Sequence, residues 1–152
     1  MLRKSRKKLK AEPENDYLEY QQKLKSLIVE HRVIYEKTAG TKINKNILEI
    51  NKTAKNILQC LIDDRSRLAK LRLFIDYYLP ELAQILNQYI AIKANNISSA
   101  QAADIIEQVE DFVPIAETAF GRILENITIQ DDSDVEIDIK IMIEKLKKKR
   151  LL

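Results

Sequence analysis

Apolar residues recur along this chain every three or four positions, which is the spacing of one face of an α-helix. The longest such stripe passes through the middle of the chain, and Leu79 and Leu86 widen it. Its members are Leu68, Leu71, Ile75, Tyr78, Leu82, Ile85, Tyr89 and Ile92. A widened stripe is typical of a helix that packs on more than one neighbour. The pattern therefore predicts a central core helix.

A proline, Pro80, interrupts this central stretch. It cannot donate a hydrogen bond to the carbonyl of Asp76, and its ring disfavours the α conformation at Leu79. We therefore expect a kink or short break near residues 77–79, inside an otherwise continuous element. Tyr78 should lie on the core stripe, and Tyr77 should be more exposed. Two interpretations stay open: the tyrosines are structural, or they line a groove for a ligand or partner.

Similar stripes predict further helices over residues 16–37 and 42–62, a fourth capped by Ser98 or Ser99, and a last one beginning near Ser133. Gly40 suits a left-handed helix end, and Thr41 can cap the helix that follows. The first helix should begin at a cap, Asn15 or Asp16, after Pro13. Together, these helical stripes predict an all-α fold: an antiparallel bundle of about five helices, in one domain over residues 14–148.

The boundary between the second helix and the central helix is open to two interpretations. Residues 63–66 (DDRS) interrupt the apolar stripe, although its phase continues through them. A single helix from 42 to 94 would be unusually long for a compact domain. We therefore favour a turn here, which would make the two helices antiparallel neighbours. In the fourth helix, Pro114 should cause a kink near Asp111, and Gly121 suggests a close helix crossing.

The run from Phe74 to Pro80 (FIDYYLP), followed by Leu82, Leu86 and Tyr89, resembles the hallmark of the XpaC family. Its members are labelled 5-bromo-4-chloroindolyl phosphate hydrolysis proteins. The resemblance extends over about residues 17–146. The sequence departs from the family pattern in two ways. Glu81 stands where a small polar residue is expected, and the membrane segments that many members carry ahead of this region are lacking. The label implies hydrolysis of phosphate esters, but it brings no agreed catalytic residues to this chain. The motif residues proposed as structural or partner-binding are Phe74, Tyr77, Tyr78, Leu79, Pro80, Leu82 and Tyr89.

Charge is distributed unevenly along the chain. The net charge is +3, and residues 1–12 and 140–152 each carry +5, so the residues between them carry −7. Residues 1–13 are predicted to be a basic tail, and both ends are expected to bind acidic surfaces in a salt-sensitive way. We expect a cytoplasmic protein with protein partners, and association with the anionic inner face of the membrane is the alternative. Nucleic acid is disfavoured because the basic residues lie in terminal runs. The basic residues of the two terminal runs are Arg3, Lys4, Arg6, Lys7, Lys8, Lys10, Lys147, Lys148, Lys149 and Arg150.

No catalytic constellation emerges from the residue types. Cys60 and Arg65 lack the spacing and the glycines of a cysteine phosphatase loop, and Cys60 is interpreted as a small core residue. Asp132 and Asp134 have the spacing of an aspartyl-phosphate site, but no other strand-like run supports the sheet that such a site needs. His31 lies on an apolar face and is interpreted as a core-edge residue, because no second histidine is present. We predict no metal and no cofactor, and a helical interaction or accessory module, with phosphate-ester hydrolase and peripheral membrane binder as alternatives.

Overall fold

The computed structural model describes residues 2–129, 141, 143 and 144, and the side chains from residue 15 onward. Within this part of the chain the fold is all-α, without a strand. The helices are α1 (Leu2–Lys37), α2 (Asn44–Asp63), α3 (Leu68–Leu73), α4 (Leu79–Ala94) and α5 (Ala100–Ile129). A 3-10 turn, Arg65–Arg67, precedes α3, and a π-helical turn, Phe74–Tyr78, joins α3 to α4. The last predicted helix falls mostly outside the described residues.

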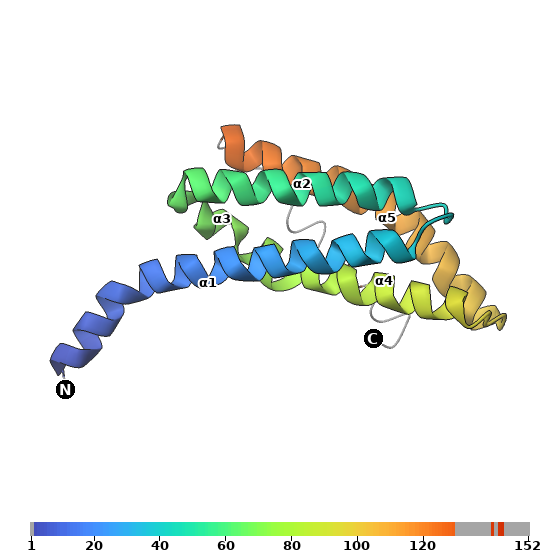
Figure 1. Cartoon of the computed structure of the whole chain (residues 1–152), viewed down its shortest axis with the longest axis horizontal. Helices are drawn as coiled ribbons and strands as arrows, with labels where there is room; N and C mark the ends of the chain where they lie inside the picture. Colours follow the sequence, from blue (N-terminus) through green and yellow to red (C-terminus); the bar gives the residue numbers. More distant parts are fainter. Residues whose placement is uncertain (1, 130–140, 142, 145–152) are drawn as a thin grey trace.

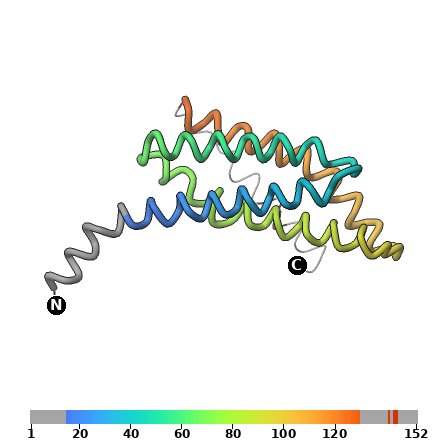
Figure 2. The backbone as a smooth tube through the Cα atoms, in the orientation of Figure 1, coloured from blue at the N-terminus to red at the C-terminus, as the bar shows by residue number. Residues whose placement is uncertain are grey.

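The helices form a bundle in which α1 and α5 each pack against both α2 and α4 (Figure 1). Successive long helices run in opposite directions, so α1 and α4 lie side by side and run the same way (Figure 2). The main contacts of α2 are therefore with α1 and α5. The short connection between α2 and the central helix predicted that α2 and α4 pack directly against each other. This prediction is wrong, because the connection crosses the bundle.

The core contains every residue of the predicted central stripe. Leu71, Ile75, Tyr78, Leu82, Ile85 and Tyr89 have no exposed surface, and Leu68 and Ile92 are almost fully buried. The stripe of α5 is buried in the same way, from Ile105 to Ile127. One residue of the last predicted helix, Ile143, also reaches the core. Most of the other residues of that predicted helix lie outside the described residues.

The turns between helices follow most of the local signals. Gly40 has a φ angle of +81°, the left-handed conformation that glycine adopts without steric cost. The Thr41 hydroxyl does not cap α2: it donates to the carbonyl oxygen of Thr38 at 2.7 Å. The favoured turn after α2 is present, with an extended backbone at Asp64 whose carboxylate accepts from the Ser66 N–H. Ser99 caps α5 by accepting from the Ala102 N–H at 3.1 Å.

Three local predictions about prolines and glycine need correction. Helix α1 begins at Leu2 and passes through Pro13, because the surrounding lysines, leucines and alanine are strong helix formers. Leu79 keeps α-helical angles (φ −68°, ψ −43°), so its expected departure from the α conformation is wrong. The disturbance expected just before Pro80 is present, as a π turn within a continuous element. By contrast, Pro114 lies inside α5 as predicted, and the kink expected near Asp111 stays a prediction. No close crossing occurs at Gly121, since a Cβ atom there would meet nothing within 4 Å.

Candidate functional site

The motif that carries the family resemblance forms the π turn and the start of α4. The Leu79 N–H bonds to the carbonyl of Phe74, five residues earlier, which is the hydrogen-bond pattern of a π helix. Phe74 packs edge-on against Phe120 of α5, with ring centroids 5.1 Å apart. Tyr78 is fully buried, whereas Tyr77 is half-buried and contacts the edge of the Tyr78 ring. The inner side of the motif is therefore part of the hydrophobic core.

The sole histidine of the chain lies directly against this turn. His31 of α1 is 1% exposed, and its Nε2 atom is 2.9 Å from the carbonyl oxygen of Leu79. Asn51 of α2 donates to the His31 backbone carbonyl at 3.2 Å. The Nδ1 atom of His31 and the Oδ1 atom of Asn51 have no hydrogen-bond partner among the described residues. Burial lowers the pKa of His31, although its bond to Leu79 acts in the opposite direction. The imidazole is thus held neutral and closed to solvent.

The outer side of the π turn carries a charged network at the surface. Asp76 accepts hydrogen bonds from the Tyr20 hydroxyl and, at 2.7 Å, from the Lys23 ammonium. Burial opposes ionisation of Asp76, but these donors outweigh it and lower its pKa. The same hydrogen bond raises the pKa of Tyr20. Arg72 pairs with Asp16 and lies over the Tyr20 ring.

These side chains surround a shallow opening of about 220 Å³, lined by Asp16, Glu19, Tyr20, Lys23 and Asp76. Lys23 pairs with Asp76, and Asp16 pairs with Arg72, whereas Glu19 makes no ion pair among the described residues. We infer that the network joins α1 to the π turn, and it leaves no unpaired cation in the opening to bind a phosphate.

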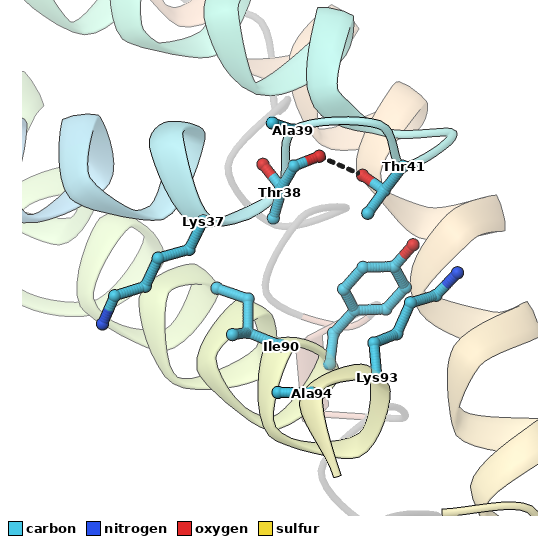
Figure 3. A pocket seen from close by; sticks show the side chains of 8 residues that line it. Lys37, Thr38, Ala39, Thr41, Ile90, Lys93 and Ala94 are labelled. Carbon is cyan, nitrogen blue, oxygen red and sulfur yellow. Dashed lines mark hydrogen bonds between the residues drawn. The ribbon is translucent and has the colours of Figure 1, made fainter. Parts of the chain in front are cut away.

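A second opening of about 240 Å³ lies at the far end of the bundle, between the α1–α2 loop and the end of α4 (Figure 3). Tyr89 donates to Glu110 of α5 at 2.9 Å, and Lys93 lies 3.8 Å from the same carboxylate oxygen. Burial and the bond to Glu110 raise the pKa of Tyr89 to about 12, so its phenol stays protonated. Figure 3 shows the ammonium groups of Lys37 and Lys93 directed to opposite sides. They do not converge on a common anion.

The side chains considered for catalysis are not brought together. Cys60 lies in the last turn of α2, where the helix dipole presents its negative end, and its carbonyl accepts from Arg67 at 3.1 Å. The described residues contain no group of three or more metal-ligating side chains. Asp132, Asp134 and the basic residues at the C-terminus lie outside the described residues, as do the side chains of the N-terminal basic run.

Sequence reasoning missed the partners of the motif. Tyr20 and Lys23 are more than fifty residues from Asp76, and His31 is 48 residues from Leu79. No local pattern links them. Only the periodicity of residues 16–37, which placed His31 on an apolar face, gave a partial signal.

The fold and the motif define a helical-bundle protein whose aromatic run lies inside the core. Comparison with known families gives a match over residues 17–142 to the 5-bromo-4-chloroindolyl phosphate hydrolysis protein family. The chain belongs to this family. Neither the curated proteins nor the solved structures gave a match. In the part of the chain that the structure describes, no helix is both long and apolar enough to cross a bilayer.

Proposed function

We propose that this protein is a helical interaction module that acts by binding and does not itself hydrolyse phosphate esters. The observation that carries this proposal is the position of the family motif. Phe74, Tyr78 and Leu79 have no exposed surface, and the histidine beside them is also buried. A side chain that reacts with a phosphate ester must reach it. These groups instead stabilise the bundle.

The charge around the other groups that could act on a phosphate ester, namely Cys60, Lys37 and Lys93, supports the same conclusion. A nucleophilic cysteine is activated by positive surroundings such as a helix N-terminus. Cys60 lies at the opposite end of its helix. The opening beside Lys37 and Lys93 adjoins the C-termini of α1 and α4, whose partial negative charge is unfavourable for phosphate. Both lysines are accounted for as favourable charges at these helix ends.

An assay of the purified full-length chain on a chromogenic phosphate ester tests the proposal. The expected rate equals that of a buffer control, with and without added Mg²⁺, Mn²⁺ or Zn²⁺. Turnover that co-purifies with the protein and is lost in Asp132→Asn or Asp134→Asn would establish the family label as a catalytic activity. A parallel affinity purification should recover a stoichiometric partner that also captures this protein when the roles are reversed.

A further inference from the structure

Helices α1 and α2 form one outer face of the bundle, and three hydrogen bonds fix their antiparallel register. Tyr17 donates to the Leu61 carbonyl at 3.2 Å, Asn51 donates to the His31 carbonyl at 3.2 Å, and Asn44 donates to the Tyr35 carbonyl at 2.8 Å. This register places residue 25 level with residue 55, and residue 18 level with residue 62. Side chains from the two helices therefore share a continuous surface.

Basic side chains occupy the outer ridge of both helices. At about 100° per residue, Lys45 and Lys52 lie on the side of α2 opposite its buried stripe, and Lys55 lies on the flank of α2 nearer α1. Lys25 and Arg32 lie on the flank of α1 nearer α2. All five are exposed. We call these five residues the α1–α2 basic face. It has three acidic neighbours. Glu36 pairs weakly with Arg32 at 4.0 Å, Glu49 pairs with Lys52 at 3.3 Å, and the exposed Asp63 accepts a hydrogen bond from Gln59 at 2.9 Å.

Aliphatic side chains are interspersed on the same face. Leu18 and Val29 of α1 are 50% and 59% exposed, and Ile62 of α2 is 40% exposed. Valine is a weak helix former, so its exposed position does not serve the stability of α1. The combination of lysine and exposed aliphatic side chains is typical of helices that lie on a membrane surface.

The charge of this face contrasts with that of α5 on the other side of α2. Helix α5 carries six acidic residues and one basic residue, and it exposes Asp104, Glu107 and Asp111. Among the described residues, Lys25, Lys45 and Lys55 make no ion pair. The charges of these three lysines are therefore available to an anionic surface. Helix α1 also continues back to Leu2, through the basic run of residues 3–10.

We propose that the α1–α2 basic face docks on an anionic lipid bilayer. Lysine is a compact charge suited to a diffuse anionic surface, whereas arginine is the residue that reads phosphates in a fixed geometry. The face carries no exposed aromatic residue on which nucleic-acid bases could stack. The aliphatic side chains can enter the headgroup region while the ammonium groups remain at its surface. This docking is independent of whether the protein hydrolyses phosphate esters.

Sedimentation with vesicles tests the proposal on the full-length chain. Vesicles of phosphatidylcholine alone are compared with vesicles that also contain phosphatidylserine, at low and high salt. Each basic residue close to an anionic leaflet strengthens binding about fivefold. The triple variant Lys25→Gln, Lys45→Gln, Lys55→Gln should therefore bind phosphatidylserine vesicles roughly 100-fold more weakly. Val29→Ser should weaken binding further, while Ile115→Ser on α5 should not.

A matched control removes the same charge elsewhere: Lys70→Gln, Lys93→Gln, Arg122→Gln. It should retain nearly wild-type binding, and circular dichroism melts should show that both triple variants fold. Equal losses in the two triple variants would reduce the effect to net charge and overturn the proposal. So would equal binding to neutral and anionic vesicles, or a loss seen only when Lys7, Lys8 and Lys10 are changed to Gln. Preferential binding of a short DNA duplex over the vesicles would point to a nucleic-acid surface and would also overturn it.

Discussion

His31 of α1 donates a hydrogen bond to the carbonyl oxygen of Leu79, the residue directly before Pro80. The bond joins the first helix to the only π turn among the described residues. It also satisfies the buried Nε2–H group of His31, which would be costly to leave without an acceptor in the core. A single buried imidazole therefore couples α1 to the family motif.

This contact predicts that stability depends on pH in the range where histidine titrates. The folded-state pKa of His31 lies below the ordinary value of 6.5, so the unfolded chain binds the proton more readily. The stabilising contribution is complete above pH 6.5 and is lost as the pH falls toward the folded-state pKa. Chemical denaturation across this range should show the decrease. His31→Gln, which keeps a donor without a titrating group, should remove most of it; an unchanged decrease in that variant contradicts the assignment.

Leu82 should be one of the most costly positions to truncate. It has no exposed surface, and Leu82→Ala is expected to reduce the free energy of unfolding by about 2–5 kcal/mol. Gln84→Ala, on the exposed side of the same helix, is the control. Tyr77→Phe should cost much less, because it removes only the hydroxyl group and keeps the half-buried ring in place. If Tyr77→Ala and Tyr78→Ala instead kept normal melts but lost partner binding, the two rings would be a ligand platform.

The surface pair between Lys23 and Asp76 should contribute little to stability. Both side chains are nearly half-exposed, at 47% and 44%, so solvent screens their attraction. Asp76→Asn is expected to lower the free energy of unfolding by less than about 1 kcal/mol, and by less still at high salt. Denaturant titrations at two salt concentrations measure the difference. A larger loss would mean that the network supports the π turn more strongly than its exposure indicates.

Gly121 offers a stabilising substitution. It lies inside α5, and a Cβ atom there would meet nothing within 4 Å. Gly121→Ala should raise the free energy of unfolding by roughly 0.5–1 kcal/mol, because alanine loses less backbone freedom in a helix. Gly40→Ala is the opposite case, since the left-handed angle at that position disfavours any side chain. A thermal melt of each variant should show shifts of opposite sign.

Local sequence patterns predicted the helices and the core well, because burial repeats with the helical period. The stripe from Leu68 to Ile92 and the glycine turn at Gly40 both follow directly from residue type and spacing. The diagonal placement of α2 and α4 has no such signal, since it depends on which buried faces of the four long helices pack against one another. The π turn also escaped prediction: Pro80 indicated a disturbance, but Leu79 was expected to leave the α conformation. The His31–Leu79 contact requires the assembled bundle.

The π turn also determines where the chain can lose a residue. A π turn holds one residue more than the corresponding α-helical turn, so deleting one residue from Phe74–Tyr78 can leave the helices on either side in phase. A deletion within Glu81–Tyr89 would instead rotate everything after it by about 100° and carry core residues such as Ile92 toward solvent. Tolerance to length change within the central element should therefore be confined to the family motif itself, which makes this short aromatic run the natural site of length variation in the central helix.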